Sequence, residues 1–215
     1  MFANPILLIF AFLFSLSIHE AAHAYMADRL GDPTAKLAGR ITFNPLAHLD
    51  PMGTLLPLFL LMTGSPIIFG WGKPVPFDPF NLRNPRRDAA LISFAGPGVN
   101  LILAVFLSIL IRLAHLTIGS TAFIAEFALA PIVALNVMWA IFNLLPVHPL
   151  DGGKVIVGLL PENSAREVDE FLHQYGLVIL VFLIFPFFGF SMISKLVWPL
   201  VQFVLAILLP GTPLV

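Results

Sequence analysis

The segment SLSIHEAAHAYMADRL, residues 15–30, places two histidines and a glutamate inside an apolar run. We expect a first membrane-spanning helix over about Pro5–Ala27, because roughly 20 apolar residues are needed to cross a bilayer as a helix. The helix is expected to end at Asp28, Arg29 and the turn Gly31-Asp32-Pro33. Ionisable groups in hydrocarbon cost several kcal/mol, so they usually face the protein interior and serve a function.

The composition of the whole chain points to a membrane protein. Of its 215 residues, 59% are hydrophobic and only 11% are charged, and the mean hydropathy is +0.96. A soluble domain is usually about half apolar and about a quarter charged. Residues 89–111 and 127–147 carry no charge at all. Cysteine is absent, which excludes disulfides and thiolate chemistry. A signal peptide is not expected, because Met1–Phe14 has no Lys or Arg.

We therefore predict an all-α integral membrane protein, with a bundle of about five to six transmembrane helices, a re-entrant loop and a short β-like segment. The chain is expected to form a single domain over residues 1–215, with a catalytic core at about 1–160 and a C-terminal helical hairpin at about 171–210. After the first helix we expect a weak extended segment at Lys36–Phe43, an apolar segment broken by Pro and Gly at Asn44–Phe69, and a polar loop at Gly72–Asp88. Two spans follow at about Ala89–Ala114 and Phe123–Leu145, and then a short amphipathic piece and an acidic stretch at Glu162–Glu170. The segment Leu177–Leu209 is expected to form two short spans, with a break near Pro186 and Gly189.

Basic residues predict how the bundle is oriented. Seven of the 11 Lys and Arg lie in two loops, namely Arg29, Lys36, Arg40, Lys73, Arg83, Arg86 and Arg87. Cytoplasmic loops near membrane spans collect Lys and Arg, so both loops are expected on the cytoplasmic side. The segment Asn44–Phe69 would then dip into the membrane and return.

The motif H-E-x-x-H at His19-Glu20-Ala21-Ala22-His23 predicts a metal site. Residues four apart on a helix share one face, so His19 and His23 can bind one zinc ion. The adjacent Glu20 can act as a general base on water. Buried polar residues that tie helices together are the alternative, which three ionisable residues in five positions make less favourable.

A catalytic zinc takes three protein ligands and keeps a fourth position open. Asp151 is the favoured third ligand, because prolines break the chain before it and Gly152-Gly153 lets the backbone approach closely. The predicted orientation also places Asp151 in the same leaflet as the two histidines. His148 is the main rival, either as an outer-shell partner of the zinc site or as a substitute ligand, and the alternative of equal weight is an interfacial histidine at a helix break.

Other polar residues are less strongly indicated as members of the site. His48 with Asp50 could face the zinc from the re-entrant segment, although ordinary turn hydrogen bonds are the favoured interpretation. His115 and Glu126 flank the predicted outer loop, and His173 lies on a predicted wet surface.

The chain resembles the site-2 protease family of intramembrane zinc metalloproteases, and most closely the small bacterial branch without a PDZ domain. The motifs that carry the resemblance are HEAAH at His19–His23, G-P-x-x-N at Gly96–Asn100, N-P-x-x-H-x-D-P-x-G at Asn44–Gly53, G-W-x-K-P-V-P at Gly70–Pro76, and the stretch from F-N-L-L-P to L-D-G-G at Phe142–Gly153.

The resemblance implies one zinc ion per chain, held by His19, His23 and Asp151, with Glu20 as catalytic acid and base. It also implies that Asn143 positions the substrate or stabilises an oxyanion. His148 departs from the pattern, where a small or apolar residue is expected. The implied substrate is a membrane-spanning protein or peptide, which would unwind near the site and pair with an edge at Lys36–Phe43.

The implied location is the bacterial inner membrane, as a multi-pass protein in contact with the lipid bilayer, with its site toward the cytoplasm and no nucleic-acid partner. Two other functions stay open. A metal or proton transporter would show internal repeats and polar residues spread along a path, and we find neither. A noncatalytic scaffold with structural zinc would need no glutamate beside His19.

Overall fold

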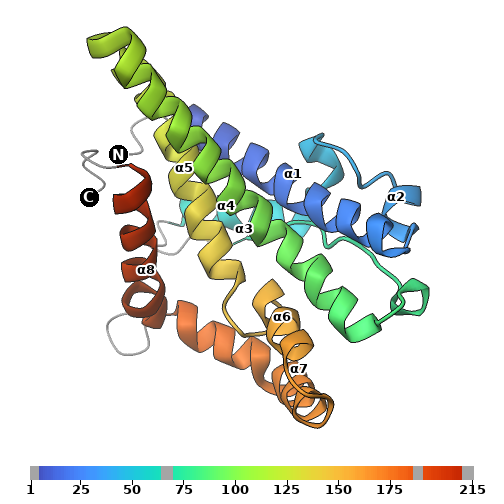
Figure 1. The fold of residues 1–215 in the computed structure, drawn as a ribbon. Helices are drawn as coiled ribbons and strands as arrows, with labels where there is room; N and C mark the ends of the chain where they lie inside the picture. Colours follow the sequence, from blue (N-terminus) through green and yellow to red (C-terminus); the bar gives the residue numbers. More distant parts are fainter. Residues whose placement is uncertain (1–4, 64–69, 186–190, 210–215) are drawn as a thin grey trace.

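The computed structural model describes residues 5–63, 70–185 and 191–209, and this part of the chain is almost entirely helical (Figure 1). The helices are α1 (Pro5–Leu30), α2 (Thr34–Leu37), η1 (Pro45–Ala47), α3 (Pro51–Met62), η2 (Pro79–Asn81), α4 (Pro85–Ile118), η3 (Gly119–Ala122), α5 (Phe123–Asn143), α6 (Asp151–Leu159), α7 (Glu162–Ile184) and α8 (Met192–Leu208). Extended pairing in the described ranges is limited to one antiparallel bridge between Leu49 and Gly72. The all-α prediction is confirmed.

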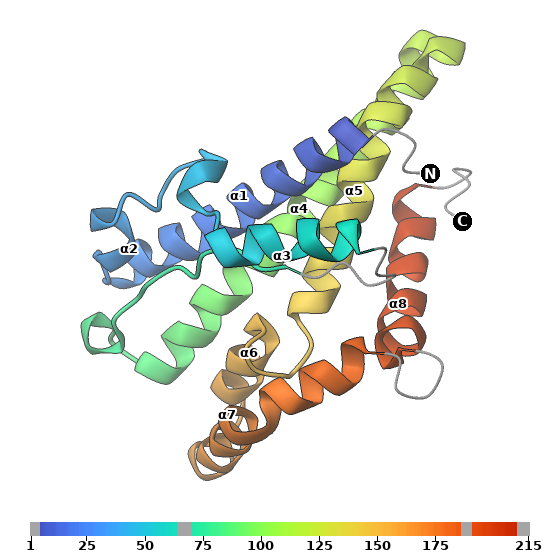
Figure 2. The same cartoon turned by 180° about the vertical axis from the view of Figure 1, so that it is seen from behind.

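Helices α1, α4 and α5 form the centre of the molecule, and α8 packs against α5 (Figures 1 and 2). Alanines at the contacts, among them Ala11, Ala104 and Ala130, are at most 2% exposed. Small side chains let helix backbones approach closely, which is how helices commonly associate in membranes. Helix α6 packs on α4 and α7, at the end of α5 where the chain turns back (Figure 2).

Two of the described helices, α4 and α5, are long and apolar enough to cross a membrane by length and composition alone. Large apolar side chains point outward from α4, where Ile102 is 69% and Phe106 is 55% exposed. Water is a poor solvent for such a surface, whereas lipid tails cover it without penalty. This criterion finds two candidate spans in the described residues, so it does not confirm the finer prediction of about five to six spans.

The extended segment predicted at Lys36–Phe43 is wrong. Its first residues belong to the helical turn α2, and the chain then bends through Gly39, whose φ is +69°. The Asp32 side chain accepts hydrogen bonds from the amide and hydroxyl of Thr34 just before the turn. Local hydrogen bonding by Asp therefore overrides the weak β propensity of this segment.

The apolar segment Asn44–Phe69 contains a continuous helix despite its prolines and glycines. Asp50 accepts a hydrogen bond from the Gly53 amide and acts as an N-cap, and Pro51 occupies the first helical position, where its missing N–H costs nothing. The 12 residues of α3 span about 18 Å, which is short of the roughly 30 Å of a bilayer core. The end of the predicted segment, residues 64–69, lies outside the described residues.

The C-terminal half also differs from the prediction. Helix α7 begins in the acidic stretch at Glu162 and continues to Ile184, so the acidic residues and the apolar residues share one helix. The predicted break near Pro186 and Gly189 lies outside the described residues. The division into a catalytic core and a C-terminal hairpin stays a prediction.

Two loops that are far apart in the sequence bind each other beside α1. Asp32 accepts hydrogen bonds from the Asp78 amide (2.7 Å) and the Asn81 side chain (2.8 Å). Burial alone would raise the pKa of Asp32, but these bonds and those from Thr34 hold it below its usual value. Arg40 is 4% exposed and donates to the carbonyls of Lys73 and Pro74. These contacts fix the segment after residue 70 next to the first helix.

Candidate active site

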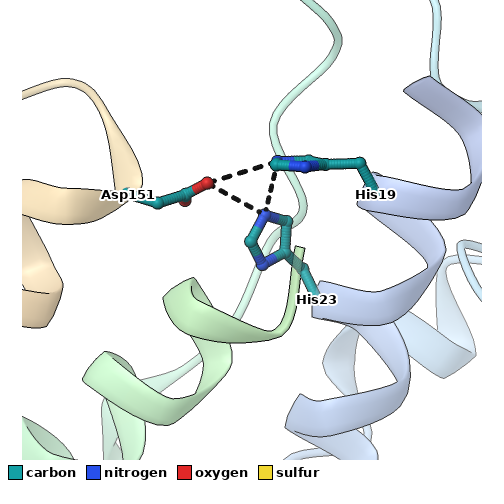
Figure 3. Close-up of side chains that lie close together, drawn as sticks. All are labelled: His19, His23 and Asp151. Atoms are coloured by element: carbon teal, nitrogen blue, oxygen red, sulfur yellow. Dashed lines mark hydrogen bonds and ion pairs between the residues drawn. The ribbon is translucent and has the colours of Figure 1, made fainter. Parts of the chain in front are cut away.

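Three side chains from two distant helices converge on one point (Figure 3). His19 and His23 lie on consecutive turns of α1, and Asp151 begins α6. The two Nε2 atoms are 3.0 Å apart. Asp151 Oδ2 lies 3.2 Å from His19 Nε2 and 3.4 Å from His23 Nε2. The structure thus brings together the three residues predicted to bind metal.

These separations suit a zinc ion. Ligands at about 2.0–2.1 Å from a tetrahedral zinc lie about 3.3 Å from one another. Two imidazole nitrogens and one carboxylate oxygen form a donor set that zinc commonly takes in catalytic sites, with one position left for water or substrate. A zinc ion among these three buried electron-pair donors would offset their mutual repulsion.

Helix α4 orients both imidazoles without providing a ligand. The Nδ1 atom of His23 lies 2.7 Å from the carbonyl oxygen of Ile92, to which it donates. This bond puts the ring hydrogen on Nδ1 and leaves Nε2 free to bind metal. The Asn100 Nδ2 atom lies 3.3 Å from His19 Nδ1, and the Oδ1 atom of the same buried amide has no partner. A flip of this amide would present Oδ1 to a hydrogen on Nδ1, which would satisfy the oxygen and select in His19 the same tautomer as in His23.

Gly96 provides the space that the imidazoles occupy. A Cβ at this position would lie 2.4 Å from His23 Nε2 and 2.7 Å from His19 Cε1. Both distances are below any normal contact, so a side chain here would displace the two histidines. Sequence reasoning singled out Gly96–Asn100 only as part of a resemblance, and the structure gives Gly96 and Asn100 a physical role.

The glycine pair after Asp151 behaves as predicted. A Cβ on Gly152 would lie 2.3 Å from the carbonyl oxygens of both Leu144 and Leu145. A Cβ on Gly153 would lie 2.6 Å from His148 Nδ1. The close return of the chain after α5 is possible only without side chains at these positions, and it aims Asp151 at α1.

The sequence matches a known family over most of its length. A model of peptidase family M50 matches residues 7–122 and 111–187. The chain belongs to peptidase family M50. The predicted resemblance to site-2 proteases is confirmed, and so is the prediction of a zinc metalloprotease at the level of the family and its named relatives.

Similar proteins come from several bacteria. The protein named "Putative zinc metalloprotease YwhC" from Bacillus subtilis is 36% identical over 201 residues, which are 91% of this chain and 85% of the relative. Two proteins named "Putative zinc metalloprotease Rip2", from Mycolicibacterium smegmatis and Mycobacterium tuberculosis, are each 33% identical. They align with 88% and 83% of this chain, and with 76% and 66% of their own lengths. No solved structure matches the chain at a significant level.

A cavity of about 310 Å³ opens beside the three converging side chains of this M50 member. Its lining includes Glu20, the predicted acid and base, and Asn143, whose Nδ2 also donates to the Trp139 carbonyl at 3.1 Å. Gly72 lies close enough to Glu20 that a Cβ there would be 3.2 Å from Glu20 Oε1. Other lining residues are Leu16, Trp71, Pro74, Val75, Phe77, Trp139, Phe142 and Lys154.

Two candidate histidines lie apart from this cavity. The ring of His48 is buried, and its Nε2 donates to the Thr42 carbonyl at 2.8 Å, a turn contact of the kind that the sequence favoured. The ring of His148 faces Asp169 of α7, at 3.2 Å between Nε2 and Oδ1. Neither imidazole is among the donors that converge at Asp151 in the described residues.

Proposed function

We propose that this chain is an intramembrane endopeptidase that hydrolyses peptide bonds of membrane-spanning segments, with zinc held by His19, His23 and Asp151. The observation that carries the proposal is the buried convergence of these three donors beside Glu20, in one cavity among apolar helices. A structural zinc site would be closed by a fourth protein ligand, whereas this site opens into a cavity.

Each residue has one task in the proposed reaction. Zinc, when bound, supplies a Lewis acid that polarises the peptide carbonyl and acidifies water. Glu20 accepts the proton from the attacking water and returns it to the leaving amine. Asn143, across the cavity, donates a hydrogen bond that orients the peptide carbonyl. The Ile92 carbonyl keeps His23 in the tautomer that binds through Nε2, and Asn100, with its amide oxygen turned to Nδ1, would do the same for His19.

The substrate reaches the site as an extended chain. Helical carbonyls are hidden in hydrogen bonds, so a membrane-spanning substrate must unwind before hydrolysis. The segment Gly70–Val75 lines the cavity in a non-helical conformation, and Arg40 fixes it by binding two of its carbonyls. This segment therefore replaces Lys36–Phe43 as the backbone beside which the substrate lies.

The chain is proposed to be a multi-pass protein of the bacterial inner membrane, with its site toward the cytoplasm. Contacts of Asp32 and Arg40 with residues 73–81 support a common side for the two basic loops. The length of α3 supports a segment that enters the membrane and returns. We infer from this arrangement that the partners are lipids and a membrane-spanning substrate, and that nucleic acid is not among them.

A cleavage assay on the purified protein with a membrane-spanning peptide tests the proposed activity. A chelator should abolish cleavage and zinc should restore it. Glu20→Gln should retain zinc and lose about 10²–10⁴-fold in rate, because it removes the base but preserves the imidazoles. The control is Glu167→Gln, an exposed glutamate on α7. Wild-type turnover by Glu20→Gln would exclude the proposed role, and zinc transport without cleavage would favour the transporter.

The proposed orientation is tested with single cysteines, because the chain has none to remove. An impermeant thiol reagent should label cysteines at Lys36 and Arg83 from the same face of the membrane. Labelling from opposite faces would show that Asn44–Phe69 crosses the membrane.

A further inference from the structure

A second group of metal-binding side chains lies on the far side of the loop that leads to Asp151. It consists of His148, from that loop, and Asp169 and His173, from consecutive turns of α7. Asp169 Oδ1 lies 3.2 Å from His148 Nε2 and 3.6 Å from His173 Nε2. One nitrogen of each histidine and one oxygen of Asp169 all lie within 4.8 Å of one another. We name these three residues the α7 cluster.

His148 is the most closely packed member of the α7 cluster, and its side chain is only 9% exposed. Its backbone carbonyl and Cβ lie 2.6 and 3.0 Å from where a Cβ on Gly176 would be, and Gly153 gives similar room to its Nδ1. Two glycines on different helices therefore make the space in which this imidazole is held. A side chain packed in this way keeps Nε2 directed at α7.

The other two members have the freedom to close around an ion. The side chains of Asp169 and His173 are 43% and 72% exposed. Their 3.6 Å separation exceeds a hydrogen bond, so the pair as it stands gains little from each other. The His148 and His173 rings face each other at 4.6 Å between centroids. Rotamer changes of the two exposed side chains would bring three donors within the spacing that a transition metal needs.

We propose that the α7 cluster is a second metal site, which binds zinc or another late first-row transition metal ion. Imidazole nitrogens suit these ions, whereas calcium and magnesium take oxygen ligands. An ion here would link α7 to the loop that carries Asp151.

Equilibrium zinc binding by the full-length protein in detergent tests the second site. We expect wild type to bind one more zinc equivalent than His173→Ala, which removes an exposed ligand and leaves the packing of His148 intact. Asp169→Asn should weaken the same equivalent at least tenfold. Gln174→Ala, an exposed neighbour on α7, is the control and should bind as wild type does.

The experiment measures the difference in bound zinc between wild type and His173→Ala, so its result does not depend on the buried site or on protease activity. Equal stoichiometry and affinity in wild type and His173→Ala would overturn the proposal. Displacement of the additional zinc by millimolar magnesium would overturn it too, because a site built on two imidazoles should not exchange its ion for magnesium.

Discussion

The buried triad of His19, His23 and Asp151 and the α7 cluster have the same donor types but different support. In the buried triad the donor atoms are 3.0–3.4 Å apart, and both imidazoles are 5–7% exposed. In the α7 cluster one imidazole is buried and the other is largely exposed. The difference is made by a third helix, because α4 orients both rings of the buried triad and no equivalent helix covers His173 in the described residues. Preorganised ligands favour tight binding and fixed geometry, whereas free ones favour adjustable binding.

The largest expected effect comes from Asp151→Ala. This substitution removes the carboxylate whose negative charge offsets that of the zinc ion, and it leaves only two buried imidazoles as ligands. We expect zinc affinity at the buried triad to fall by well over the 10–100-fold that outer-shell partners contribute. Equilibrium dialysis with metal analysis measures it, and Asp169→Ala serves as the matched control, since it removes a carboxylate from the α7 cluster only. Tight zinc retained in Asp151→Ala would show that another residue is the third ligand.

A change without any ligand atom should come next. Gly96→Ala would place a methyl group 2.4 Å from His23 Nε2, and the rigid contact between α1 and α4 leaves little room for relief. We expect about a 100-fold loss of zinc affinity at the buried triad. Gly98→Ala is the control, because its Cβ would meet only the movable ring of Phe94 at 3.3 Å. Equal behaviour of the two variants would mean that α4 does not set the ligand geometry.

Asn100→Ala tests the outer support of His19 alone. Without the amide, His19 Nδ1 loses its hydrogen-bond partner, and the ring is no longer held in one orientation and tautomer. We expect a 10–100-fold loss of zinc affinity, smaller than that of Gly96→Ala, because both ligands stay in place. Asn136→Ala removes another fully buried amide, which binds Ser15 and no metal ligand, so it should lower the free energy of unfolding but not zinc affinity. A zinc affinity that is unchanged in Asn100→Ala would contradict the orienting role.

These comparisons also show what the sequence could and could not predict. The pair His19 and His23 follows from helical periodicity, and Asp151 follows from the prolines and glycines around it, so both could be found from local patterns. The contributions of Gly96 and Asn100 depend on how α4 packs against α1, about 80 positions away, and no local pattern contains that contact. The wrong assignment at Lys36–Phe43 arose because the chain there begins in a helical turn, next to an Asp32 side chain that accepts hydrogen bonds from Thr34, and β propensity does not include such local bonds.

The smallest expected effect is that of His148→Ala on the buried triad. His148 is only three residues from Asp151, which made it the main rival for the third ligand, but its ring faces α7 and contacts Gly153 and Asp169. The position of Asp151 depends on Gly152 packing against Leu144 and Leu145, and His148→Ala leaves that contact unchanged. We therefore expect zinc affinity at the buried triad to change by less than about tenfold, below the range of outer-shell partners. The α7 cluster should lose its ion in the same variant. Competition titration with a chelator of known affinity resolves the two sites. If the buried triad weakened as much as in Asp151→Ala, the two clusters would have to be treated as one site, and the contrast between them would fail.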